Sequence, residues 1–237
     1  MKTLNILTRT SGRPNFFKVC KQSIRQQDYP NIKHWVIVDD KNLNNYVYEY
    51  PDIEIINVST KDHDHFETYL NEGLEKLPKG ELFCVMDDDD FYVRDDSLSR
   101  AVQVLGEGDV VFFQVQCAGG LVPYPDLMRG PNKRLEGGQI SMEGFVMQVD
   151  FTWNPVTGKR IQFPGVYGGD WAFIDACIGY NYGPDGTLKD DFRDWNNNKI
   201  RWCIEKLAST NPCRRQGSGE SLDMDYNTIL QGYQRSK

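Results

Sequence analysis

The chain has 237 residues, of which 39% are hydrophobic and 26% are charged, so it can build a buried core and is not a mainly disordered protein. Its net charge of −7 argues against binding to nucleic acids or anionic membranes, which basic surfaces normally contact. The six cysteines contain no CxxC pair, no segment approaches the roughly 18 apolar residues of a membrane helix, and the first residues do not resemble a signal peptide. We therefore predict reduced thiols, a cytoplasmic location and no transmembrane segment.

The first half of the sequence alternates apolar runs with stretches of amphipathic spacing. Strands are predicted at 4–8, 35–38, 53–58, 82–86 and 110–115. Helices are predicted from Pro14 to Ile24, at 66–77 and at 98–105, where apolar residues recur three and four positions apart. This order indicates an α/β fold with a mostly parallel sheet and helices on both faces.

The second half is less regular and richer in glycine, proline and polar residues. It predicts long loops at 119–138 and 153–169, a strand at 139–151, a short helix at 170–178 and another helix at 200–207. Residues 209–221 are typical of a flexible link, and 222–234 of a last short helix or a frayed tail.

The stretch from Leu82 to Tyr92 is the most informative part of the sequence. Five apolar residues predict a buried strand, and Asp87 to Asp90 follow directly at its carboxyl end, where ligands bind in open α/β sheets. Packing four carboxylates together is unfavourable unless a cation offsets their repulsion. A Mg²⁺ or Mn²⁺ ion that also holds a diphosphate fits this chemistry. The alternative is an acidic, solvated turn before a helix, with Asp95 or Asp96 as its N-cap.

Five motifs in this order give the first 115 residues or so a specific resemblance. The sequence resembles GT-A fold glycosyltransferases of the family-2-like group, the nucleotide-diphospho-sugar transferases. The motifs are Leu-Thr-Arg-Thr-Ser-Gly-Arg-Pro at 7–14, Ser-Ile-Arg-Gln-Gln-Asp-Tyr-Pro-Asn at 23–31, Val-Ile-Val-Asp-Asp at 36–40, Tyr-Leu-Asn-Glu-Gly-Leu at 69–74, and Lys-Gly-Glu at 79–81 followed by Val-Met-Asp-Asp-Asp-Asp at 85–90.

The resemblance implies a single GT-A, Rossmann-like domain with a smaller, less regular acceptor-side half. Within residues 1–237, we expect a nucleotide-sugar-binding half at 1–116, an acceptor-side half at 117–208 and a polar C-terminal tail at 209–237.

The resemblance also implies a donor site along the carboxyl edge of the sheet. Asp89 and Asp87 are expected to bind the metal as a D-x-D pair, and Asp87 is also expected to contact the sugar or ribose. Asp88 and Asp90 could take either role instead. Asp39 is suited to accept the N3–H of a uracil ring, although a loop cap is the alternative for Asp39 and Asp40. The expected donor-binding residues are Thr8, Arg9, Thr10, Arg13, Asp39, Asp40, Asn71, Asp87 and Asp88.

An inverting transfer needs one base to deprotonate the acceptor hydroxyl. The resemblance places this base at the start of a helix in the second half, where Asp170 follows Gly168 and Gly169. The alternative is that Asp170 only caps the helix, because Asp is a preferred N-cap residue. Asp150, Glu143 and Asp175 are weaker candidates for the base, and His63 and His65 are further candidates for contact with the donor or the metal.

Together these inferences predict a metal-dependent, hexosyltransferase-type enzyme. It would use Mn²⁺ or Mg²⁺ and transfer a sugar from a nucleotide-sugar donor, a UDP-sugar, to a hydroxyl acceptor such as a glycan. The alternatives are a non-catalytic relative that binds nucleotide sugars or glycans, and a sugar-nucleotide nucleotidyltransferase. The latter normally carries a glycine-rich basic loop after its first strand, whereas residues 8–14 contain one glycine.

Overall fold

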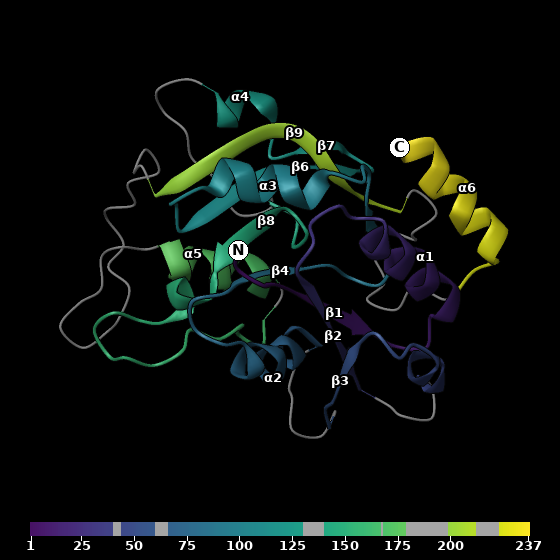
Figure 1. Cartoon of the computed structure of the whole chain (residues 1–237), viewed down its shortest axis with the longest axis horizontal. Helices are drawn as coiled ribbons and strands as arrows, with labels where there is room; N and C mark the ends of the chain where they lie inside the picture. Colours follow the sequence, from purple (N-terminus) through teal and green to yellow (C-terminus); the bar gives the residue numbers. More distant parts are fainter. Residues whose placement is uncertain (40–43, 60–65, 130–139, 167, 179–198, 212–222) are drawn as a thin grey trace.

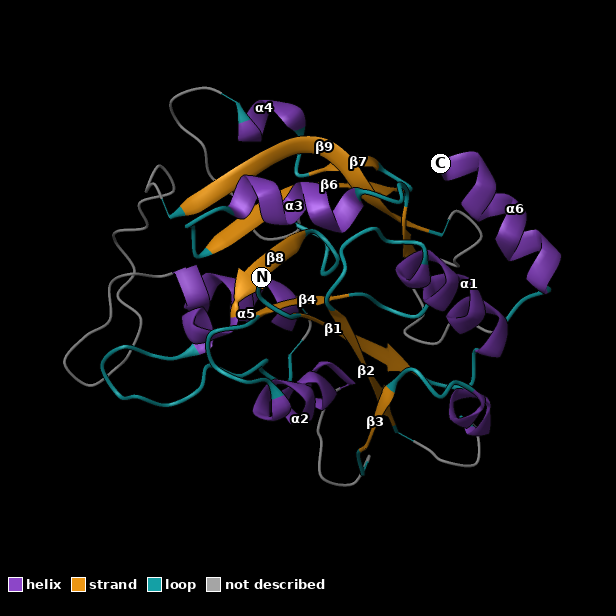
Figure 2. Cartoon of the chain, viewed as in Figure 1, coloured by secondary structure: helices purple, strands orange, loops and turns teal. Residues whose placement is uncertain are grey.

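The computed structural model describes the chain except for residues 40–43, 60–65, 130–139, 167, 179–198 and 212–222. At its centre lies one nine-stranded sheet in the order β3-β2-β1-β4-β8-β6-β9-β5, with β7 paired to β6 (Figures 1 and 2). The strands are β1 Leu4–Thr10, β2 Ile32–Val38, β3 Glu54–Asn57, β4 Leu82–Val85, β5 Asp90–Tyr92, β6 Val110–Cys117, β7 Gly120–Val122, β8 Phe145–Gln148 and β9 Ile200–Thr210. The helices are α1 Pro14–Arg25, α2 Tyr69–Lys76, α3 Ser97–Leu105, α4 Pro125–Met128, α5 Gly169–Ile178 and α6 Tyr226–Ser236, with 3₁₀ turns η1 Asn45–Glu49, η3 Phe66–Thr68 and η4 Val149–Thr152.

The first four strands along the chain are parallel, as the sequence predicts. β1 pairs with β2 and β4, and β2 pairs with β3, all in parallel register. Their carboxyl ends therefore meet at one edge of the sheet. This edge collects the residues that follow Thr10, Val38 and Val85.

The core lies on both faces of the sheet because side chains alternate along each strand. On one face, Leu82 and Cys84 of β4 pack in the same cluster as side chains of α1 and α3. On the other face, Phe83 and Val85 pack with side chains of α2 and α5. Helices thus cover both faces, and the predicted α/β fold class is confirmed.

The second half adds antiparallel pairings to this sheet. β8 pairs antiparallel with both β4 and β6, and β6 pairs antiparallel with β7. Of the strand predicted at 139–151, the structure has β8 at Phe145–Gln148, followed by the 3₁₀ turn η4, while residue 139 lies outside the described residues. The short helix predicted at 170–178 is α5.

The helix predicted at 200–207 is wrong, because these residues form the first part of strand β9. Ile200, Cys203 and Leu207 are buried at a spacing that fits one face of a helix. In the structure this spacing arises because β9 pairs with β6 through two register shifts, on either side of Gln114. Such irregularities break the two-residue alternation of a strand, so the sequence pattern resembles that of a helix.

The C-terminal residues end in a helix that packs on the domain. Asp225 caps α6 by accepting a hydrogen bond from the backbone N–H of Thr228 (3.2 Å). Ile229 and Tyr233 pack with Phe16 and Val19 of α1, and Figure 1 shows the two helices side by side. The segment predicted as either a short helix or a frayed tail therefore includes a docked helix.

Two further sequence features concern the environment of the protein. Across the described part of the chain, none of the helices combines the length and the apolar character needed to cross a lipid bilayer. Among the described cysteines, Cys20, Cys84, Cys177 and Cys203 are free thiols.

Candidate active site

Four consecutive carboxylates, Asp87 to Asp90, occupy the turn that follows β4. The turn closes with a hydrogen bond from the N–H of Asp90 to the carbonyl of Asp87 (3.1 Å), after which Asp90 begins β5. Carboxylate oxygens of Asp87, Asp89 and Asp90 lie within 4.8 Å of one another. Since Asp89 is only 4% exposed and Asp90 only 1%, this is a buried cluster rather than the solvated turn that was the alternative.

Two arginines bind this cluster, Arg9 near the end of β1 and Arg13 just before α1. Arg9 forms a forked ion pair with Asp87, with Nη2 lying 2.6 Å from Oδ2 and Nε lying 3.0 Å from Oδ1. Arg13 donates from Nη1 to Asp89 (3.0 Å) and also binds Asp88. Burial lowers the pKa of both guanidinium groups, but the carboxylates outweigh this effect and raise it overall, so both arginines stay charged.

Asp88 points into the protein and serves the geometry of the site. It is fully buried and accepts hydrogen bonds from Arg13 and from the hydroxyl of Thr10 (2.6 Å). Burial raises the pKa of Asp88 to about 7, although Arg13 acts in the opposite direction. The contact with Thr10 ties the end of β1 to the turn after β4.

The remaining charges of the cluster suit a divalent cation. The charge of Asp88 is balanced by Arg13. The ionised carboxylates of Asp87, Asp89 and Asp90 together with Arg9 then leave a net charge of −2. Carboxylate oxygens are the ligands that Mg²⁺ and Mn²⁺ prefer. The residues present therefore fit the predicted metal, with Asp90 as a third ligand candidate that the predicted D-x-D pair does not include.

Asp39 lies at the same edge, directly after β2. Its carboxylate accepts hydrogen bonds from the hydroxyl of Ser11 (2.9 Å) and the amide of Asn44 (3.0 Å). Asn44 in turn accepts from the N–H of Gly12 (2.8 Å), so the loops after β1 and β2 are bound to each other. Asp40 lies outside the described residues.

Two of the predicted donor-binding side chains are engaged elsewhere. The hydroxyl of Thr8 is fully buried and lies 2.9 Å from Nε2 of His34. Burial lowers the pKa of His34 to about 3. The amide of Asn71 donates to the carbonyl of Phe163 (3.0 Å) and accepts from its N–H (2.7 Å), which fixes a loop against α2. The structure does not bring these two polar groups to the acidic edge.

Asp170 lies in the first turn of α5. Its Oδ1 accepts a hydrogen bond from the N–H of Trp171 (2.7 Å). Burial raises the pKa of Asp170, with further contributions from the negative charges of Glu143 and Asp87 and an opposing one from Arg9. These electrostatic contacts place Asp170 in the field of the donor-side charges.

Glu67 in η3 is a site residue that the sequence analysis missed. Glu67 is 7% exposed, and its Oε2 lies against Gly169. A side chain at position 169 would not fit, because its Cβ would collide with Oε2 of Glu67 and lie 2.6 Å from the carbonyl oxygen of Pro164. A signal was present in the sequence, since Glu67 precedes Leu70 and Leu74 by three and seven positions and so occupies the buried face of the helical stretch. Gly168 has a φ of +77°, which requires glycine for conformational reasons.

The weaker candidates for the base differ in their positions. Asp150 is exposed and accepts a hydrogen bond from the N–H of Gly80 (2.7 Å). Glu143 is 2% exposed, binds the hydroxyl of Ser141 and contributes to the field at Asp170. Asp175 lies further along α5. His63 and His65 lie outside the described residues.

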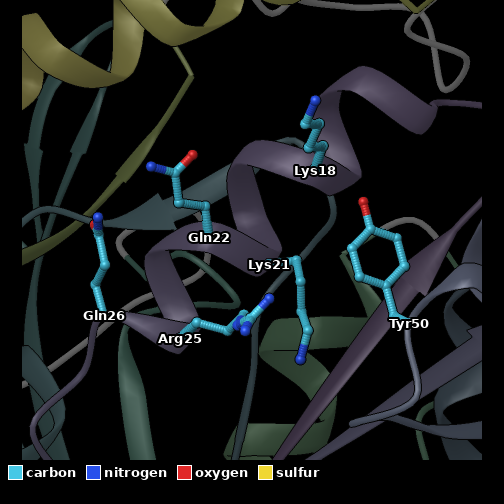
Figure 3. A pocket seen from close by; sticks show the side chains of 6 residues that line it. All are labelled: Lys18, Lys21, Gln22, Arg25, Gln26 and Tyr50. Atoms are coloured by element: carbon cyan, nitrogen blue, oxygen red, sulfur yellow. The ribbon is translucent and has the colours of Figure 1, made fainter.

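A separate hollow of about 290 Å³ lies beside α1 and Tyr50 (Figure 3). Its main cations already have partners within the protein. Lys21 forms an ion pair with Asp52 (2.9 Å), and Lys18 lies over the ring of Tyr226 (4.2 Å to its centre). This hollow therefore carries no functional assignment here.

Comparison with known proteins supports a fold assignment. No protein-family model matches the sequence, and no curated protein matches it by sequence. Among solved structures, the chain is similar to S. aureus TarS 1-349 in complex with UDP-GlcNAc, with a TM-score of 0.63 and 13% identity over 99% of this chain and 66% of that one. It is also similar to the mannosyltransferase PcManGT from Pyrobaculum calidifontis in complex with GDP-Man and Mn²⁺, with a TM-score of 0.56 and 16% identity over 90% of this chain and 58% of that one.

The chain thus spans less than two thirds of the length of these two proteins, at 66% and 58%. The TM-scores of 0.63 and 0.56 show a shared fold, and at identities of 13% and 16% the likeness shows nothing finer. Both proteins are GT-A glycosyltransferases, and the resemblance seen in the sequence motifs is borne out at the level of the fold. The protein therefore has the GT-A fold.

Proposed function

We propose that this protein is a metal-dependent glycosyltransferase that takes its sugar from a UDP-sugar. The observation that carries the proposal is the carboxylate cluster of Asp87, Asp89 and Asp90 at the carboxyl edge of the sheet. The charge of Asp87 also acts on Asp170, in the first turn of α5. A diphosphate held by the metal and an acceptor hydroxyl held near Asp170 would then be neighbours.

The metal would be held by Asp89 and Asp87, with Asp90 as a possible further ligand. Bound Mn²⁺ or Mg²⁺ would act as a Lewis acid for the diphosphate leaving group. Arg9 and Arg13 are positioned to add positive charge on the same side, where negative charge develops as the glycosyl bond breaks. Asp39, bound to Ser11 and Asn44, offers a carboxylate oxygen to the N3–H of uracil.

Asp170 would be the general base of an inverting transfer. The acceptor oxygen forms the new bond to the anomeric carbon while its proton moves to Asp170. The bond from that carbon to the diphosphate oxygen breaks, and its electron pair leaves with the diphosphate. The structures of TarS with UDP-GlcNAc and of PcManGT with GDP-Man and Mn²⁺ support nucleotide sugars as the class of donor.

The proposal is tested by thermal unfolding of the purified chain with UDP, GDP, their sugar conjugates and UTP, each with Mn²⁺, Mg²⁺ or EDTA. A ligand that binds only the folded state raises the stability by about 2.7 kcal/mol at one hundred times its Kd. We expect UDP with Mn²⁺ to raise the melting temperature and EDTA to abolish the effect. Asp89→Ala should lose the metal-dependent response while retaining the fold.

Asp95→Ala is the matched control, because Asp95 is an exposed aspartate outside the cluster whose ion pair with Lys237 contributes little. It should keep the full response to UDP and Mn²⁺. An Asp89→Ala protein with the wild-type response would remove the metal site from the proposal. Stabilisation by UTP rather than UDP would favour a nucleotidyltransferase, and no response to any nucleotide would contradict the donor class.

A further inference from the structure

Helix α1 begins directly after Arg13, and its first turn is capped by a residue from a distant part of the chain. Arg13 precedes the helix but makes no side-chain cap hydrogen bond. Instead, Oδ1 of Asp223 accepts hydrogen bonds from the backbone N–H groups of Asn15 (3.1 Å) and Phe16 (3.3 Å). These are the second and third residues of α1, whose N–H groups an N-cap side chain normally binds. Asp223 therefore acts as the cap, although it lies 208 positions from Asn15.

Further hydrogen bonds fix Asp223 in this place. Nδ2 of Asn15 donates to Oδ2 of Asp223 (2.9 Å) and to the carbonyl of Met224 (2.9 Å). The negative charge of Asp223 also lies at the positive end of the α1 dipole, where a carboxylate is favourable. The start of α1 is thus held by residues 223–236, which we call the C-terminal segment and which include α6.

The C-terminal segment also supports the strand that follows the acidic turn, Asp87 to Asp90. The ring of Phe91, in β5, packs edge to face on the ring of Tyr233, in α6, with 4.8 Å between the ring centres. These two side chains belong to one buried cluster that also contains Phe16 and Ile229. Figure 1 shows α6 beside α1. The segment therefore contacts both the helix that follows Arg13 and the strand that follows the acidic turn.

Arg13 connects the capped helix to the acidic turn. Its carbonyl accepts a hydrogen bond from the N–H of Phe17 (3.0 Å), which joins its main chain to α1. Its side chain donates from Nη1 to Asp89 (3.0 Å) and from Nε to Asp88 (3.2 Å). A shift of the first turn of α1 would therefore move the guanidinium group of Arg13 relative to these carboxylates.

Resting on the proposed function, we propose that Asp223 is a positioning residue for Arg13. By capping α1, Asp223 holds the guanidinium group of Arg13 at the acidic turn, where that group meets the diphosphate of the donor. Asp223 acts through the helix and does not itself contact the donor. Without the cap, the first turn of α1 frays and only a fraction of the molecules present Arg13 correctly. The apparent Kd for the donor then rises by the inverse of that fraction.

The simpler alternative is that Asp223 contributes to stability alone. Both ideas predict a lower melting temperature for Asp223→Ala, because a helix cap is lost. They differ in ligand binding, since a positioning role also lowers the affinity of the folded protein for UDP. Asp225→Ala is the matched control, because Asp225 caps α6 through the N–H of Thr228 (3.2 Å) and not α1.

The first measurement is titration calorimetry with UDP at saturating Mn²⁺, at a temperature where every variant is folded. We expect Asp223→Ala to weaken UDP binding by roughly threefold to tenfold, the factor that corresponds to a lost cap, and Asp225→Ala to match wild type. Asp223→Asn keeps an oxygen acceptor for the N–H groups of Asn15 and Phe16, so it should restore most of the affinity. Equal UDP affinities in Asp223→Ala and wild type would overturn the proposal.

A double-mutant cycle tests whether the effect passes through Arg13. Arg13→Gln should weaken UDP binding, and the addition of Asp223→Ala to it should cause no further loss, because the group that Asp223 positions is already absent. Losses that simply add in the double variant would show that Asp223 acts by another route and would contradict the proposal.

Hydrogen exchange without nucleotide gives an answer that is independent of donor binding. The N–H of Asp90 closes the acidic turn by donating to the carbonyl of Asp87, and it should exchange faster in Asp223→Ala than in wild type, because Arg13 holds the turn less firmly. Unchanged exchange at Asp90 would contradict the link from the cap to the turn. If wild type does not bind UDP, the proposed function fails while this comparison still stands.

Asn15→Ala serves as a second variant in case Asp223→Ala does not fold. It removes the side-chain hydrogen bonds that fix Asp223 and Met224 but keeps the backbone N–H groups of α1. UDP affinity and the exchange at Asp90 should change in the same direction as in Asp223→Ala, by a smaller factor. Wild-type values of both in Asn15→Ala would count against the proposal.

Discussion

On the proposed donor side of the site, Asp87 to Asp90 are held by two arginines. On the proposed acceptor side, Asp170 interacts electrostatically with two buried glutamates, Glu67 and Glu143. The donor side is assembled from the ends of β1 and β4, which are adjacent parallel strands. The acceptor side is assembled from three separate segments. Ion pairs can be exchanged for a metal and a diphosphate, whereas loss of a general base lowers turnover, so substitutions on the two sides should affect different measurements.

The largest expected effect separates catalysis from binding. Asp170→Asn should lower transfer by about 10²-fold to 10⁴-fold, because a general base contributes on that order. The side-chain oxygen of asparagine can still accept the hydrogen bond from the N–H of Trp171, so the fold should be retained. Release of UDP measures turnover, and thermal shift with UDP and Mn²⁺ should remain as in wild type.

Asp175→Asn, on the same helix, is the control for that substitution. It should retain turnover. If instead Asp170→Asn keeps wild-type turnover, Asp170 is not the general base and the base lies elsewhere.

A smaller effect is expected on the affinity for Mn²⁺ when Arg9, which competes with the metal for Asp87, is replaced. Arg9 binds both oxygens of Asp87, so a metal that uses Asp87 as a ligand would compete with it. Arg9→Gln should therefore raise the affinity for Mn²⁺ alone by roughly tenfold, since charged hydrogen bonds are worth about 1.5–3 kcal/mol, and should weaken the binding of UDP. Titration calorimetry with Mn²⁺, before and after addition of UDP, measures both changes.

Arg25→Gln is the control for Arg9→Gln, because the side chain of Arg25 is 66% exposed and lies at the end of α1 away from Arg13. A lower affinity for Mn²⁺ in Arg9→Gln would show that the arginine organises the metal ligands instead of competing for them. The two sides of the site would then be more alike than the ion pairs suggest.

The smallest expected effect concerns the nucleotide base. Asp39→Ala should weaken UDP binding by about 1 kcal/mol, roughly fivefold, with or without metal, because it removes one hydrogen-bond acceptor. Ser11→Ala, which removes a neighbour of Asp39 but keeps its carboxylate, should have less effect. Equal UDP affinities in Asp39→Ala and wild type, measured in EDTA, would place the base in a different pocket.

The donor side could be predicted further from sequence than the acceptor side. Strand β4 is uniformly apolar and is followed by carboxylates, and Arg9 follows the strand predicted at 4–8, so the parallel order of the strands was enough to expect these groups at one edge. The ion pairs themselves were not foreseen, and Thr8 was expected at the donor although its hydroxyl is buried beside His34. The alternation of side chains along a strand predicts the face of the sheet on which each one lies, but not the polar group with which it forms a hydrogen bond.

The acceptor side depended on contacts between distant residues. Glu67 and Gly169 are separated by about a hundred positions in the chain, and nothing local to either residue announces their contact. The same limit explains strand β9, where irregular pairing with β6 gave the buried residues a helical spacing. Both misses involve partners that sequence periodicity does not encode.

By itself, the sequence determined the α/β class, the parallel first half, the acidic turn after β4 and the glycine-flanked Asp170, because these follow from local periodicity and from residue chemistry. Tertiary structure alone decided which carboxylates pair with arginines, how β9 joins the sheet, and that Glu67 lies against Gly169. The physical reason is that burial and electrostatic interaction depend on distance in space, and the distance between remote segments is set only when the sheet and its helices pack together.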